Sequence, residues 1–134
     1  MKVGLISYQV LWQRIGGLQR QIQETAKALS RKGIEAEIVC DSSRPFGKFD
    51  VLHVFGLGHG NWTIVDEAKR QGIRVVLSPL LHGPANRVKR LFMDIGEAMV
   101  WRLTGDRNVL YLSRITKSLD LADVIVAISI AEAR

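Results

Sequence analysis

The sequence predicts an α/β fold with a doubly wound, mostly parallel sheet. Short apolar runs of strand length alternate with longer segments whose apolar residues recur at helical spacing. The runs at 49–55 and 73–77 are apolar almost throughout, as in strands that helices cover on both faces. Loops containing glycine follow these runs. This alternation calls for right-handed crossovers between parallel strands in a single domain, residues 1–134.

The first strand, its loop and the first helix are expected within residues 1–33. An apolar run at 3–6 precedes an irregular loop that ends in Gly16 and Gly17. The next segment has apolar residues at i, i+4, i+8 and i+11, which form one face of a helix: Leu18, Ile22, Ala26 and Leu29. Gly33 follows two basic residues, where a helix commonly ends. Together these features predict the first half of a βαβ unit.

The remaining elements follow in order along the chain. Further strands are expected at 36–40, 49–55, 73–77 and 123–128, and helices at 62–71, 85–104, 108–121 and from 129 onward. Loops rich in glycine, serine or proline separate them. The last strand is so apolar that it needs a helix to cover it. We therefore expect the C-terminus at Arg134 to be a truncation.

The composition is that of a globular protein with an affinity for anions. Of the 134 residues, 47% are hydrophobic and 24% are charged, and the net charge is +6. This charge favours nucleotide phosphates or anionic lipid, with a basic surface that has no dedicated partner as the alternative. No groove-reading motif accompanies the basic residues, so no nucleic acid partner is expected. No signal peptide or membrane-spanning run is visible, which predicts a cytoplasmic protein.

Cys40 and the basic segment 85–104 bear on the surroundings of the protein. As the single cysteine, Cys40 cannot form an intrachain disulfide, which fits a reducing compartment. It ends an apolar run and is expected to be a small buried core residue. In segment 85–104, Trp101 lies off the apolar stripe. That face could rest on the inner membrane surface, or it could be solvated or pack on a neighbouring domain.

The loop that ends in Gly16 and Gly17 is a candidate anion site. It leaves the carboxyl end of a strand, where open α/β sheets bind ligands. It also precedes a helix, whose free N–H groups and dipole favour an anion. It contains neither the G-x-G-x-x-G dinucleotide fingerprint nor a Walker A sequence. The alternative is that the two glycines only permit a tight entry into the helix.

The three histidines are expected in different surroundings. His53 lies inside the strand at 49–55 and should be a core histidine with one satisfied nitrogen. His59 and His82 follow neighbouring strands, at the edge where ligands bind. There His82 could contact a sugar hydroxyl or a phosphate, or it could bond a backbone carbonyl and only stabilise its loop. No third ligand stands at a recognisable zinc spacing, so no metal is expected.

Five stretches of the chain, taken in order, resemble a known protein family. They are KVGLIS, GGLQRQIQETAKALSRKGIEAEIV, FDVLHVFG, GIRVVLSPLLHG and ADVIVAIS, and they extend over nearly the whole sequence. In this order they resemble the N-terminal domain of GT-B-fold glycosyltransferases, and most of all the family-4-like retaining enzymes. The resemblance implies a Rossmann-like sheet and a cleft shared with a C-terminal domain that holds most of the donor site. It also implies a nucleotide-sugar donor, a glycan or lipid acceptor, and no required metal or other cofactor.

The resemblance also assigns roles to individual residues. Gly16 and Gly17 match the glycine pair that approaches the donor diphosphate through backbone N–H groups. His82 matches a histidine near the transferred sugar and is the catalytic candidate. Ser129 matches a serine that faces the cleft, and Tyr8 begins the loop that would border the acceptor.

Two functions therefore remain open. The first is the acceptor-side domain of a retaining hexosyltransferase, which would be inactive without its C-terminal donor domain. The second is a non-catalytic Rossmann-like domain that binds a phosphate-bearing ligand or a protein partner.

Overall fold

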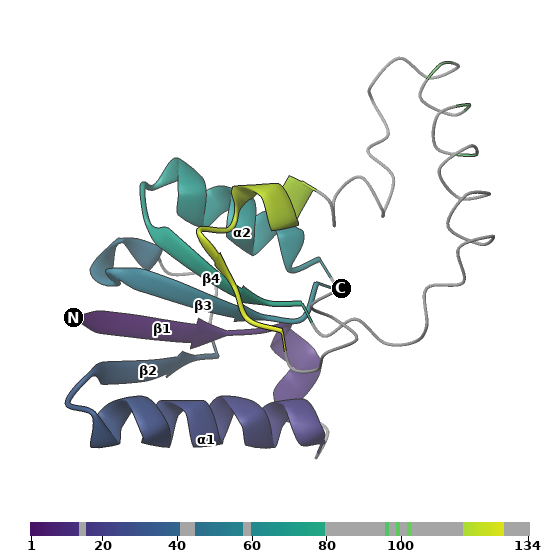
Figure 1. Ribbon diagram of the computed structural model, residues 1–134. Helices are drawn as coiled ribbons and strands as arrows, with labels where there is room; N and C mark the ends of the chain where they lie inside the picture. The colour runs from purple at the N-terminus through teal and green to yellow at the C-terminus, as the bar shows by residue number, and fades with distance from the viewer. Residues whose placement is uncertain are drawn as a thin grey trace.

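The computed structural model describes residues 1–13, 16–40, 45–57, 60–79, 96, 99, 102 and 117–127. Its elements are β1 (Lys2–Ile6), η1 (Gln9–Gln13), α1 (Gly17–Arg31), β2 (Glu35–Val39), η2 (Phe46–Lys48), β3 (Val51–Phe55), α2 (Trp62–Arg70), β4 (Arg74–Ser78) and β5 (Val124–Ile125). Residues 117–121 are also helical. Figure 1 shows the strands side by side in one sheet, with the labelled helices outside it. The expected α/β class is confirmed.

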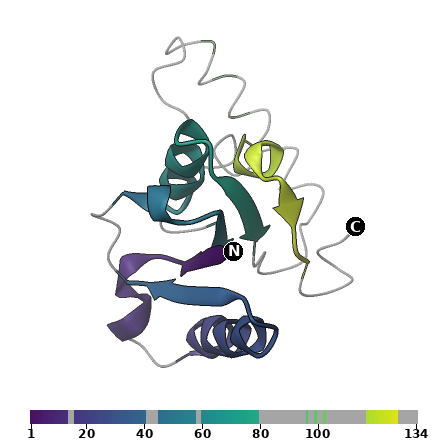
Figure 2. The same ribbon diagram turned by 90° about the vertical axis from the view of Figure 1, so that its left-hand side faces the viewer.

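The five strands form one sheet in the order β2-β1-β3-β4-β5, and every neighbouring pair is parallel. The chain passes from β1 through α1 to β2. It then returns to the other side of β1, where it forms β3, α2 and β4 (Figure 2). This change of direction makes the sheet doubly wound, as the sequence predicts.

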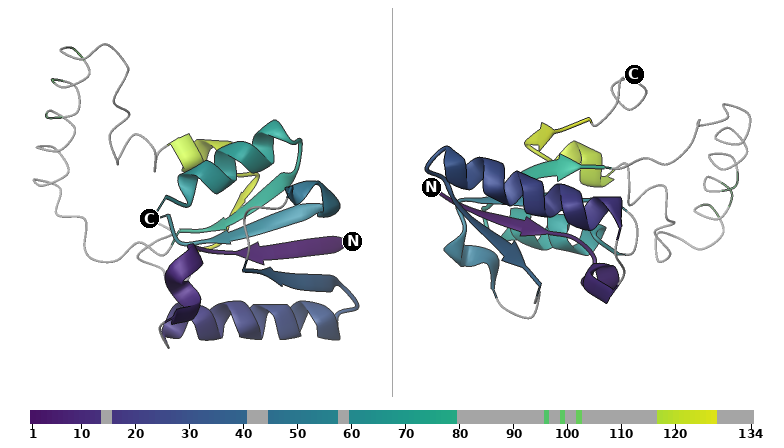
Figure 3. Two further views of the ribbon diagram at one scale, coloured as in Figure 1. Left: turned by 180° about the vertical axis from the view of Figure 1, so that it is seen from behind. Right: turned by 90° about the horizontal axis from the view of Figure 1, so that it is seen from below.

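Helices α1 and α2 cover opposite faces of the sheet because successive strand residues point to opposite sides. On one face, Leu5 of β1 packs in a core with Ile22 of α1. On the other, Leu52 and Val54 of β3 pack in a core with Val65 of α2. Figure 3 shows α1 lying along β1 and β2. The core is thus two layers of apolar side chains with the sheet between them.

Two glycines have clear structural reasons. A Cβ atom at Gly4 would lie 2.9 Å from the side chains of both Leu52 and Phe49, so β1 tolerates only glycine at this point without repacking. Gly33, after α1, has a φ of 74°, which glycine adopts without strain. Its role in ending the helix was expected from the sequence, whereas the close approach at Gly4 was not.

The structure corrects three expectations. The third strand begins at Val51 instead of 49, because Phe49 lies between η2 and β3 with its side chain in the core. Cys40 is exposed and not a core residue, because it follows β2 at the edge of the sheet. The last strand is shorter than the expected 123–128: β5 spans Val124–Ile125, and these two residues are 52% and 50% exposed. It lies at the opposite edge, where β4 alone pairs with it among the described strands.

Part of the expected helical structure lies outside the described residues. Residues 96, 99 and 102 are helical, within the helix expected at 85–104, but Trp101 is not among the described positions. Most of the helix expected at 108–121 and the segment 128–134 also lie outside them. Of the helices that the structure describes, none combines the length and apolar character needed to cross a membrane.

Candidate functional site

The switch in strand order places the candidate site at the carboxyl ends of β1 and β3. These two strands are neighbours, yet the chain leaves them for opposite sides of the sheet. The loop after β1 leads to α1 on one face, and the loop after β3 leads to α2 on the other. Loops that diverge in this way leave a crevice in which α/β proteins bind their ligands.

The N-terminus of α1 opens at this edge without a side-chain cap. Its N-cap residue, Gly16, makes no capping side-chain hydrogen bond, and the first turn contains no acidic residue. The exposed Arg20 adds a positive charge one turn into the helix. The first N–H groups of a helix lack partners within it, and the dipole adds partial positive charge there. This end of α1 is therefore suited to an anion.

Gly16 and Gly17 are open to an approaching ligand. Both are exposed, and a Cβ atom at either position would meet nothing within 4 Å. Gly16 has an extended backbone with a φ of −162°, and neither glycine has positive φ. Other residues adopt such angles, so the turn itself does not require glycine. This weakens the alternative of a tight helix entry and leaves access to the backbone N–H groups as the better reason for the pair.

Two buried side chains bond the carboxyl end of β3 at this edge, and one of them, Ser7, joins it to β1. The hydroxyl of Ser7 donates to the carbonyl oxygen of Phe55 at 2.7 Å. The side-chain amide of Asn61 donates to the same oxygen and to that of Gly56, both at 2.9 Å. Ser7 is 8% exposed and Asn61 is 1% exposed. These bonds fix the two loops where they leave the sheet.

His53 lies half-buried in β3, close to this edge of the sheet. Its Nε2 lies 2.9 Å from the Ser78 hydroxyl in a hydrogen bond, and its ring stacks on Phe55 with centroids 4.0 Å apart. Burial lowers the pKa of His53 from 6.5 to about 4, so the ring is neutral near pH 7. The expected satisfied nitrogen is confirmed, but the ring is half-buried beside the core and not fully inside it. Ser78 also fixes the loop after β3, because its carbonyl accepts from the Gly56 N–H at 2.7 Å.

The structure places three of the five assigned residues. Gly16 and Gly17 form the N-terminus of α1, and Tyr8 lies in the same connection, two residues after β1. Tyr8 is half-buried against the α1-side core, and its carbonyl accepts from the Leu11 N–H at 3.1 Å. His82 and Ser129, like His59, lie outside the described residues.

Ser7 and Asn61 were not foreseen from the sequence. Serine directly after a strand and asparagine before a helix are common, and neither position by itself signals a bond. Their shared acceptor, Phe55, is 48 residues from Ser7 along the chain. A topological signal did exist: Ser7 follows the first predicted strand and Asn61 precedes a predicted helix, at the edge where the loops converge.

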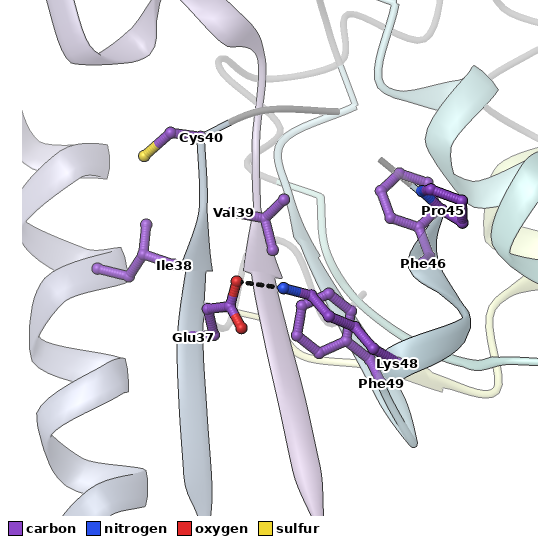
Figure 4. Close-up of a pocket in the computed structure, with 8 residues that line it drawn as sticks. All are labelled: Glu37, Ile38, Val39, Cys40, Pro45, Phe46, Lys48 and Phe49. Carbon is purple, nitrogen blue, oxygen red and sulfur yellow. Dashed lines mark hydrogen bonds and ion pairs between the residues drawn. The ribbon is translucent and has the colours of Figure 1, made fainter. Parts of the chain in front are cut away.

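A hollow lies at the carboxyl end of β2, away from the switch point. It has a volume of about 200 Å³ and is lined by residues that include Val39, Cys40, Phe46, Phe49, Glu37 and Lys48. Figure 4 shows Lys48 reaching the Glu37 carboxylate, which it contacts at 2.6 Å. Because Lys48 and Glu37 pair with each other, their charges attract a ligand less strongly than the N-terminus of α1 does. No group of three metal-ligating side chains occurs among the residues with described positions.

Comparison with known proteins identifies no relative of this chain. No protein-family model matches it. No curated protein and no solved structure matches it either.

Proposed function

We propose that this chain is the acceptor-side domain of a retaining glycosyltransferase. The complete enzyme would transfer a hexose from a nucleotide-diphosphate sugar to a glycan or lipid acceptor. The observation that carries the proposal is the uncapped, glycine-entered N-terminus of α1 at the switch point between β1 and β3. The ordered resemblance of five stretches of sequence to the N-terminal domains of such enzymes supports it.

The chemistry of glycosyl transfer gives this helix end a use. Breaking the bond between the sugar and the diphosphate leaves negative charge on the departing oxygens. Fixed N–H groups and the helix dipole stabilise charge that develops there without needing to reorganise. The missing Cβ atoms at Gly16 and Gly17 let a phosphate come within hydrogen-bond distance of the backbone. No metal ion is invoked for this step.

The remaining assigned residues complete the proposed cleft. His82 would contact the transferred sugar, Ser129 would face the cleft, and Tyr8 would border the acceptor. The C-terminal domain would hold most of the donor. We further propose a cytoplasmic enzyme whose basic segment 85–104 contacts an anionic membrane surface, which would suit a lipid acceptor.

A second candidate is a non-catalytic domain that binds a phosphate-bearing ligand. It is favoured because the polar side chains at the carboxyl ends of β1, β3 and β4 hydrogen-bond to other groups of the protein. Ser7 and Asn61 bond backbone carbonyls, and Ser78 pairs with His53. Under this alternative the helix end binds the ligand, and the described residues take part in no bond cleavage.

Binding of nucleoside diphosphates by the 134-residue chain tests the site, and Gly17→Val is the informative variant. A Cβ atom at Gly17 meets nothing within 4 Å, so we expect valine to keep the fold while it blocks a phosphate. Gly47→Val is a matched control, because a Cβ at Gly47 also meets nothing within 4 Å and it lies away from the site. We expect UDP or GDP to bind the control but not Gly17→Val. Sugar transfer by the full-length protein distinguishes the two candidates. An enzyme should show transfer that is lost in Gly17→Val, whereas a binding domain should show none.

A further inference from the structure

We draw no further inference here: the strongest candidate, the hollow at the carboxyl end of β2 that Val39, Phe46 and Phe49 line, carries none, because its two charged side chains, Glu37 and Lys48, pair with each other and nothing in the described part of the structure shows what would occupy it.

Discussion

The hydroxyl of Ser7, at the end of β1, donates to the carbonyl oxygen of Phe55, at the end of β3, over 2.7 Å. This bond joins the two strands at the point where the chain diverges to opposite faces of the sheet. Asn61 completes the junction from the start of α2, with one further bond to Phe55 and one to Gly56. The geometry of the candidate site therefore depends on a small buried polar cluster, and its members can be tested separately.

Removing Asn61 should destabilise the fold more than removing Ser7. In Ser7→Ala the Phe55 carbonyl keeps its bond from Asn61, so we expect a loss of about 1 kcal/mol. In Asn61→Ala the buried bond to the Phe55 carbonyl and the half-buried bond to the Gly56 carbonyl are both lost and a small cavity remains, so we expect a loss of about 2–3 kcal/mol. Urea unfolding of both variants measures the difference. A greater loss in Ser7→Ala would mean that Asn61 is not the main support of this junction.

Gly4→Ala should destabilise the sheet through close contact alone. The added Cβ would lie 2.9 Å from the side chains of Leu52 and Phe49, both of which are buried. Overpacking of this kind costs about 1–3 kcal/mol. Gly47→Ala is the control, since its Cβ meets nothing within 4 Å. Thermal unfolding should show a clear drop for the first variant only, and equal melting temperatures would show that β1 can shift to make room.

Stability should depend on pH through His53. The pKa of this side chain is 6.5 in the unfolded reference and about 4 in the fold, because burial disfavours the charged ring. Between these values the unfolded chain binds a proton that the folded chain does not. The free energy of unfolding therefore falls as pH falls from about 6.5 to about 4, by about 3 kcal/mol from this group.

The variant His53→Gln isolates that contribution. Carboxylates such as Glu37 and Asp123, whose pKa values are also lowered in the fold, add to acid destabilisation in both proteins. The difference between the two curves of stability against pH belongs to His53. Parallel curves across this range would mean that the imidazole titrates normally in the folded protein.

The thiol of Cys40 should react in the native state. It is exposed, just past β2, and it is the single cysteine of the chain. A thiol reagent such as an aromatic disulfide should consume one thiol per chain without denaturant and leave circular dichroism unchanged. Reaction that requires urea would place this side chain back in the core.

The sequence predicted the elements that rest on local pattern. The run at 3–6 and the helical spacing from Leu18 to Leu29 each have a strong period, and both elements formed with bounds close to those expected. The doubly wound, parallel arrangement followed from the rules that govern such sheets. Gly33 ended its helix as glycine after basic residues commonly does.

Features that depend on contacts between distant residues were not predicted. The apolar run ending at Cys40 does not reveal that its last residue passes beyond the sheet. The apolar run from 124 does not reveal that it forms an edge. Gly4 resembles any strand residue until the positions of Leu52 and Phe49 are known. The roles assigned to His82 and Ser129 stay predictions, since these residues lie outside the described ranges.

The proposed binding of a nucleoside diphosphate at the N-terminus of α1 can be tested through amide chemical shifts. A nucleoside diphosphate is titrated into isotope-labelled protein, with the nucleoside alone as the control. We predict that the N–H signals of residues 17–19 shift with the diphosphate and not with the nucleoside. The same signals should stay unchanged in Gly17→Val, whose fold is kept. Shifts that are absent from these residues, or that persist in Gly17→Val, would show that this helix end is not the diphosphate site.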